Sequence, residues 1–198
     1  PSVDAKMLDG QIGYIQLYTF GDDTARDLRN AIEELSAQNP VGLILDLRNN
    51  GGGYLETAID VASEFIPDGI VMYEEYGDGS RETYEARRGG TATEIPLVVL
   101  INQGSASASE IVAGAIQDRG RGLLVGETSF GKGSVQTYNA LVNEQGAVRI
   151  TIARWFTPNE RQINEVGLEP DVKVELTEED LAADLDPQLD QAIELLSK

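Results

Sequence analysis

The sequence of 198 residues contains neither histidine nor cysteine, and basic residues are scarce, at 15 against 34 acidic ones. Without cysteine there is no disulfide framework, no thiolate nucleophile, and no zinc-finger or iron–sulfur site. Without histidine there is no Ser-His-Asp triad, no HExxH zinc site and no imidazole base. If the chain is an enzyme, its general base must therefore be a carboxylate, a lysine or a tyrosine.

The acidic surplus gives the chain a formal net charge of −19. This charge disfavours binding to the phosphate backbone of nucleic acids and to anionic membranes, since both select basic patches. No apolar run reaches the length of about 18 residues that indicates a membrane-spanning helix. The hydrophobic fraction of 41% and charged fraction of 25% are ordinary for a globular domain. We therefore expect a folded domain with no nucleic-acid partner and no membrane span.

Apolar strands alternate with helical segments, which predicts a layered α/β core. Val41–Leu47 and Pro96–Asn102 are nearly continuous apolar runs, typical of strands buried on both faces. Each precedes a predicted helix, the first at Leu55–Phe65 and the second at Ser105–Asp118. A further helix is predicted from a cap at Asp22 or Asp23 through Ala37, and further strands at Ile12–Leu17, Leu123–Val125, Val135–Val142, Ala147–Phe156 and in a hairpin of Gly69–Tyr76 with Arg81–Arg87.

The C-terminal tail, residues 177–198, is acidic but retains leucine and isoleucine at helical spacing. This pattern predicts at least one amphipathic helix with a solvated acidic face, packed on the core or extending from it. The spaced residues are Leu181, Leu185, Leu189, Ile193 and Leu196.

One segment mimics a nucleotide site. Residues Gly126 to Lys132, GETSFGK, fit the first seven positions of a phosphate-binding loop. That loop also needs a Ser or Thr next and a helix whose N-terminus faces the phosphates. Here Gly133 follows the lysine and a predicted strand comes after it, so we do not interpret the segment as a nucleotide site.

Three serines, Ser105, Ser107 and Ser109, lie at a predicted strand-to-helix turn. This edge of an α/β sheet favours ligands, and the free amides of a helix N-terminus suit an oxyanion. The plain alternative is that Ser105 caps the helix and the other serines are small packing residues. These residues alone do not choose among the three serines.

Two glycine-rich segments offer further candidates. Lys132 lies between Gly131 and Gly133, so a close-packed loop could hold it as the base that a serine hydroxyl needs. The alternative is an ordinary turn lysine in solvent. After Asp46–Asn50, the amides of Gly51–Gly53 could bind a developing negative charge or form only a turn.

Taken in order along the chain, these segments resemble the carboxyl-terminal processing (tail-specific) proteases. These are Ser-Lys peptidases with a crotonase-like layered α/β core. The resemblance therefore implies such a core here, with the C-terminal helical tail added to it. The matching segments are Gly13-Tyr-Ile with Phe20, Leu43-Ile-Leu-Asp-Leu-Arg-Asn-Asn50, Gly104-Ser-Ala-Ser-Ala-Ser-Glu-Ile111, Gly114-Ala, Asp118-Arg, Phe130-Gly-Lys-Gly-Ser-Val-Gln136, Phe156-Thr-Pro158 and Gly167-Leu-Glu-Pro-Asp171.

The resemblance also implies a role for particular residues. Ser107 is the expected nucleophile, Lys132 its base and Gln136 a support for the lysine. The expected oxyanion donors are the amides of Ala108 and of Gly53, with Gly52 as the alternate. No metal or cofactor is implied. In the family a proline usually follows Asn-Asn, whereas Gly51 stands here and loosens the loop.

Members of this family usually carry a PDZ domain just before the Gly-Tyr-Ile segment, and this sequence begins too close to that segment to include one. We therefore expect residues 1–198 to be a single protease core without its PDZ domain, either as the isolated catalytic core of a longer chain or as a relative that naturally lacks this domain. Oligomerisation through missing segments remains possible, and no signal peptide is present in this piece. The resemblance implies a location outside the cytoplasm, in the periplasm, cell envelope or thylakoid lumen.

The function implied is endoproteolysis of protein or peptide substrates near their C-termini, through an acyl-enzyme. Two alternatives stay open. The first is a non-catalytic binding module on the same fold. The second is an acyl-thioester enzyme of the wider crotonase-like group, which would use the oxyanion hole without a serine nucleophile.

Overall fold

The larger of two sheets is built on the apolar runs of the sequence. In the computed structural model, which describes residues 1–140 and 146–198, its strands follow the order β1-β2-β3-β6-β7-β10. All neighbours in this sheet are parallel except β1 and β2. The strands are β1 (Val3–Leu8), β2 (Ile12–Leu17), β3 (Gly42–Asp46), β6 (Leu97–Ile101), β7 (Leu123–Gly126) and β10 (Val172–Lys173).

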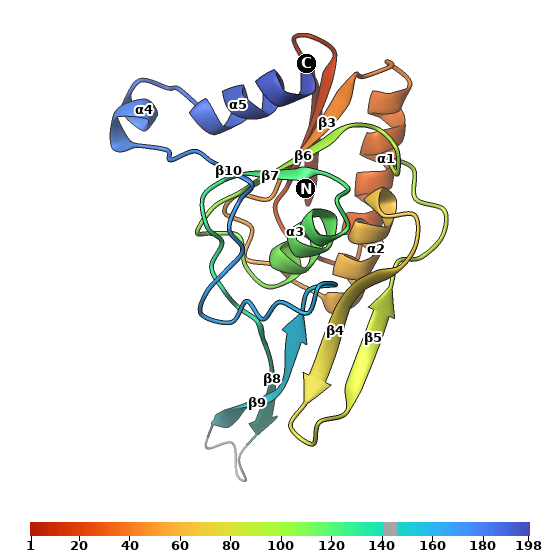
Figure 1. Ribbon diagram of the computed structural model, residues 1–198, viewed down its shortest axis with the longest axis vertical. Helices are drawn as coiled ribbons and strands as arrows, with labels where there is room; N and C mark the ends of the chain where they lie inside the picture. The colour runs from red at the N-terminus through yellow and green to blue at the C-terminus, as the bar shows by residue number, and fades with distance from the viewer. Residues whose placement is uncertain (141–145) are drawn as a thin grey trace.

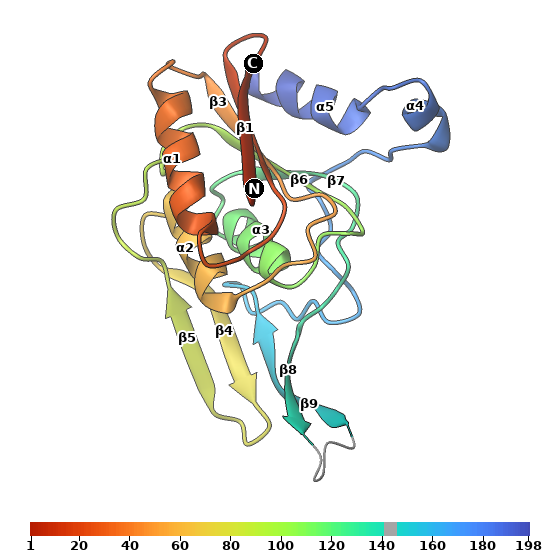
Figure 2. The same cartoon turned by 180° about the vertical axis from the view of Figure 1, so that it is seen from behind.

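Both faces of this sheet are covered. Leu45 of β3 packs into the cluster that includes residues of α1 (Thr24–Ser36), α2 (Leu55–Phe65) and α3 (Ala108–Asp118). The preceding residue, Ile44, packs into a second cluster with α5 (Pro187–Leu196) on the opposite face. Figure 1 and Figure 2 show α5 lying apart from α1, α2 and α3, with α4 (Glu178–Ala182) standing away from the sheet. Successive side chains of a strand point to opposite faces, so the central strands must be apolar throughout.

A smaller antiparallel sheet extends from this core, at the bottom of Figure 1. Its strand order is β5-β4-β9-β8, so β8 is an outer strand. Its strands are β4 (Ile70–Tyr76), β5 (Arg81–Glu85), β8 (Ser134–Ala140) and β9 (Ala147–Phe156). β8 begins two residues after Lys132, so the loop that contains this lysine leads directly into the smaller sheet.

The predicted α/β class is confirmed. The strands at Ile12–Leu17 and Ala147–Phe156 and the helix at Leu55–Phe65 have the bounds that the sequence predicts. β1 and β10 are additions, and residues 141–142 of the predicted strand Val135–Val142 lie outside the described part of the chain. The tail forms two short helices, because Pro187 starts a new helix after an exposed Leu185.

Other predicted elements differ from the structure by one or two residues at their ends, and the predicted start of the helix at Ser105 is wrong by three residues. The helix α3 starts at Ala108, and Ser107 occupies the N-cap position. Ser105 instead donates to the carbonyl oxygen of Leu47 at 2.8 Å, which ties the turn to the end of β3. Ser105 therefore makes a tertiary hydrogen bond instead of capping the helix.

A helix that crosses a bilayer needs about 18 or more predominantly apolar residues. Within the described ranges, no helix is both long and apolar enough to cross a membrane.

A leucine at the centre of the larger sheet tests the core. Leu45→Ala removes a side chain that is fully buried in β3, and we expect the free energy of unfolding to fall by about 2–5 kcal/mol. The matched control is Leu123→Ala, because the Leu123 side chain is 43% exposed and leaves no closed cavity. Urea unfolding measures both variants, and equal losses would contradict the assignment of the core.

Candidate active site

A cleft of about 250 Å³ lies between the start of α3, the glycine loop after β3 and the start of β8. It contains five of the six residues that the sequence selects, and Gly52 is the one that does not line it. The lining residues are Gly53, Leu55, Met72, Ser107, Ala108, Ile111, Lys132, Ser134, Val135, Gln136 and Trp155.

The structure separates the three serines that the residues alone left equivalent. The Ser105 and Ser109 side chains are fully buried. They donate to the carbonyl oxygens of Leu47 and Asn50, each at 2.8 Å. Both therefore tie the turn to the loop after β3, and only Ser107 lines the cleft.

Ser107 has an unusual backbone conformation, with φ of 58° and ψ of −115°. A positive φ in a residue other than glycine or asparagine costs of order 1–3 kcal/mol and persists only where the surroundings enforce it. One such contact is the Ser107 amide, which donates to Glu110 Oε2 at 2.9 Å. The adjoining Ala108 amide begins α3, where the helix dipole is positive.

Glu110 is a site residue that the sequence reasoning missed. Its carboxylate is fully buried and accepts four hydrogen bonds. Because a buried charge needs such partners, this residue joins the serine turn to the lysine loop. Its position three residues after the nucleophile candidate, inside the Ser-Ala-Ser-Glu motif, was the available signal. Its donors are Ser107 N (2.9 Å), Ser129 Oγ (2.6 Å), Gly131 N (2.7 Å) and Lys132 N (2.9 Å).

The loop around Lys132 is held from both sides. The indole Nε1 of Trp155 donates to the Lys132 carbonyl oxygen at 2.9 Å. At Gly133 a Cβ atom would come within 2.7 Å of the Asn164 amide nitrogen, so no side chain fits there. Gly131 also has φ of +88°, a conformation that glycine adopts without strain. The glycines on either side of the lysine therefore permit close packing.

Gln136 shares the cleft with Lys132. Its Nε2 atom lies 3.4 Å from Thr151 Oγ1 as a donor. Its Oε1 atom is buried, and no donor contacts it within the described residues. A buried amide oxygen normally accepts a hydrogen bond, so this atom is available to a lysine amine or a ligand in the cleft.

The glycine loop contacts the serine turn directly. A Cβ atom at Gly52 would lie 2.9 Å from the Ala108 amide nitrogen. The Gly52 amide is occupied, because it donates to Asn50 Oδ1 at 2.9 Å. In the described part of the chain, the amides of Gly53 and Ala108 donate to no protein acceptor. The geometry therefore favours Gly53 over Gly52 as the donor beside Ala108.

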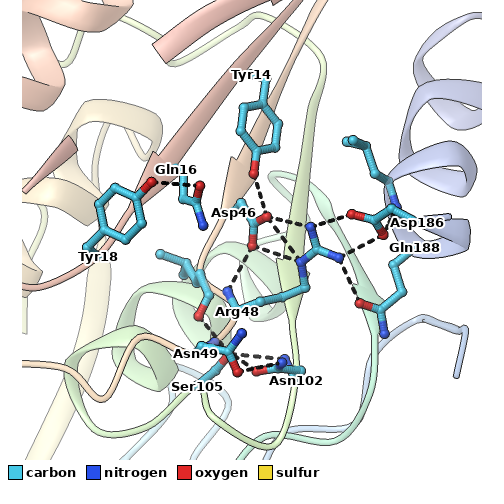
Figure 3. Close-up of polar contacts among 12 residues, drawn as sticks. Tyr14, Gln16, Tyr18, Asp46, Arg48, Asn49, Asn102, Ser105, Asp186 and Gln188 are labelled. Carbon is cyan, nitrogen blue, oxygen red and sulfur yellow. Dashed lines mark hydrogen bonds and ion pairs between the residues drawn. The ribbon is translucent and has the colours of Figure 1, made fainter. Parts of the chain in front are cut away.

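A buried ionic network lies behind this loop (Figure 3). The Arg48 guanidinium contacts Asp46 at 2.6 Å and Asp186 at 2.8 Å. Tyr14 donates to Asp46 at 2.7 Å, and burial together with this carboxylate raises the pKa of the Tyr14 phenol. Burial by itself would raise the pKa of Asp186. The hydrogen bonds from Arg48 and from the backbone amides of Leu189 and Gln188, together with the Arg48 charge, outweigh it and hold that pKa below its usual value.

The fold and the cleft define an α/β protein that presents a serine at a helix N-terminus and a lysine to one cavity. The family model described as Peptidase family S41 matches residues 11–174 of the sequence. This chain therefore belongs to peptidase family S41, which confirms the resemblance to carboxyl-terminal processing proteases.

Individual relatives agree with this assignment. The chain is 40% identical over 189 residues to a carboxyl-terminal-processing protease of Synechocystis, covering 94% of this chain and 44% of that one. It is 43% identical over 165 residues to the chloroplastic C-terminal processing peptidase of Tetradesmus obliquus, covering 83% and 35%. The chain thus spans less than half the length of these two curated relatives.

A solved structure supports the fold along the whole chain. The photosystem II D1 C-terminal processing protease superposes with a TM-score of 0.83 at 34% identity, covering 100% of this chain and 53% of that one.

The Glu110 carboxylate can be tested by removing its charge. In Glu110→Gln the amide NH₂ would face N–H and O–H donors, so we expect the free energy of unfolding to fall by about 2–4 kcal/mol. The control is Glu33→Gln on the exposed face of α1, which should stay within about 0.5 kcal/mol of the parent. Urea unfolding of both variants gives the comparison, and an unaffected Glu110→Gln would refute the role of the carboxylate.

The lowered pKa of Asp186 predicts how stability depends on pH. Because the folded chain holds the Asp186 proton less tightly than the unfolded chain, its contribution is complete above the unfolded pKa of about 3.9. It is lost as the pH falls through the lower folded pKa. Asp186→Asn keeps a capping side chain and should be less stable than the parent at pH 6, with the difference shrinking below about pH 4. Thermal unfolding across pH measures this, and a constant difference would disprove it.

Proposed function

We propose that this chain is the core of a serine endopeptidase that cleaves protein substrates near their C-termini with a Ser107–Lys132 dyad. The observation that carries the proposal is that Ser107, Lys132 and Gln136 line one cleft together with Ala108 and Gly53. The absence of histidine from the chain leaves lysine as the base in that cleft.

The proposed reaction has two stages. Neutral Lys132 takes the Ser107 hydroxyl proton while Oγ attacks the scissile carbonyl carbon, and the lysine ammonium then protonates the leaving amine. Water next attacks the acyl-enzyme, gives up a proton to the lysine amine and releases the acyl product as an acid, with the proton returned to Ser107. Gln136 Oε1 accepts a hydrogen bond from the lysine and orients it.

The oxyanion of each tetrahedral intermediate is assigned to the amides of Ala108 and Gly53. Both donate to no protein acceptor in the described ranges and adjoin the serine turn. A single such donor contributes about 3–4 kcal/mol to stabilisation of the transition state in comparable sites. Gly52 is the weaker candidate because Asn50 already accepts from its amide.

The substrate is proposed to be an unfolded protein C-terminus. The names of the relatives describe C-terminal processing. The apolar walls of the cleft, which include Met72, Ile111 and Trp155, favour an apolar side chain next to the cleaved bond. No cofactor enters this reaction.

The setting of the enzyme is also proposed. We place it outside the cytoplasm, in a periplasm, cell envelope or thylakoid lumen, on the basis of the family resemblance. One relative is named as chloroplastic. Residues 1–198 are proposed to form one protease core, with 177–198 as a tail whose α5 packs on the larger sheet.

The dyad is tested by replacing each member. Ser107→Ala should abolish cleavage of a disordered test protein and labelling by a fluorophosphonate probe, since the acyl-enzyme cannot form. Lys132→Ala should lower cleavage by at least about 10³-fold while leaving the fold intact. The matched control Lys173→Ala removes an exposed lysine and should cleave normally. Full turnover by Lys132→Ala would rule out the mechanism.

The two alternative functions give different outcomes in the same assay. A non-catalytic module would neither cleave nor be labelled at Ser107. An acyl-thioester enzyme would turn over its substrate without a covalent Ser107 adduct. A labelled Ser107 peptide seen by mass spectrometry therefore excludes both.

A further inference from the structure

The Arg48 side chain connects two parts of the chain that lie 138 residues apart. Arg48 follows β3 and begins the loop that leads to the glycines of the cleft. Asp186 is the N-cap of α5 in the C-terminal tail. The two carboxylate oxygens of Asp186 accept from Nη1 and Nη2 of Arg48, each at 2.8 Å (Figure 3). This is the bidentate geometry that fixes both position and orientation of a guanidinium.

The Arg48 guanidinium has no donor left over for solvent. Its five N–H groups are matched by acceptors on three side chains, and its side chain is only 12% exposed. Loss of any one acceptor therefore leaves a nearly buried N–H group unpaired and allows the planar group to rotate. The acceptors are Asp46 (from Nε and Nη2), Asp186 (from Nη1 and Nη2) and Gln188 (from Nη1).

The backbone that follows Arg48 leads directly to the proposed oxyanion donor. Asn49 turns the chain with φ of 59°. The next residue, Asn50, is fully buried and accepts from the Gly52 amide. The glycine loop therefore begins at Arg48, and the guanidinium fixes the start of the segment that ends at Gly53.

We propose that Asp186 is a positioning residue for the glycine loop and acts through Arg48. The geometry of the active site then depends on helix α5 of the C-terminal tail. The inference rests on the proposed function in one respect: its catalytic test measures peptide cleavage by Ser107 and Lys132. It adds to that function a dependence on a distant helix that contributes no residue to the cleft.

The ion pair is not what holds α5 on the sheet. Ala192 is fully buried, and Leu189 and Ile193 pack with it against apolar residues of the larger sheet. Asp46 remains beside Arg48 when Asp186 is neutralised, so its charge stays paired. Asp186→Asn should therefore keep the fold and the helix in place, which allows a catalytic effect to be told from unfolding.

The test compares Asp186→Asn with Asp190→Asn, which removes an exposed carboxylate from the same helix without touching Arg48. Peptide cleavage gives kcat and KM for each. For Asp186→Asn we expect kcat to fall about tenfold with KM within about twofold, less than the 10²–10³-fold cost of deleting an oxyanion donor. Asp190→Asn should match the parent, and Asp186→Glu should recover part of the loss because it restores the charge.

A second measurement does not depend on activity. Amide hydrogen exchange of the segment 48–54 should speed up roughly tenfold in Asp186→Asn relative to Asp190→Asn, since a released loop opens more often. Equal exchange in the two variants overturns the inference, even if the parent protein cleaves nothing. Equal kcat in the two variants of an active parent also overturns it. A parent that neither cleaves nor labels at Ser107 contradicts the proposed function instead, and the exchange result still decides the positioning role.

Discussion

The buried carboxylate of Glu110 is the contact on which the arrangement of the cleft depends. A charge removed from water is tolerated only when hydrogen bonds replace its hydration. Here the four donors come from two separate segments, the turn at Ser107 and the loop at Ser129 to Lys132. Satisfying the charge therefore requires both segments to be in place, which couples the position of the serine backbone to that of the lysine backbone.

The glycine loop is positioned by the same means from the opposite side. Ser105 and Ser109 donate to carbonyl oxygens of the loop that follows β3, and Asn50 accepts from the Gly52 amide. Behind them, the Arg48 network reaches the C-terminal helix.

The strands and helices were largely predictable because their signals are local. A continuous apolar run such as that of β6 can be satisfied only where both faces of a strand are covered. The start of α3 was not predictable on this basis, because the Ser105 hydroxyl donates to Leu47 in the distant loop after β3 and does not cap the helix. Short edge strands such as β10 also escape, since two residues carry no periodic pattern.

The sequence by itself determined the chemistry available to this protein: no thiol, no imidazole, three serines at one turn, a lysine between glycines, and an ordered set of motifs that identifies family S41. The family resemblance pointed to Ser107, but only the tertiary structure showed that Ser105 and Ser109 are buried while Ser107 lines the cleft, and that Asn50 already accepts from the Gly52 amide. It also showed that Glu110 joins the serine turn to the lysine loop and that Arg48 contacts Asp186. The physical reason is that hydrogen bonds between distant segments depend on positions in space. Composition and periodicity report only what each segment prefers locally.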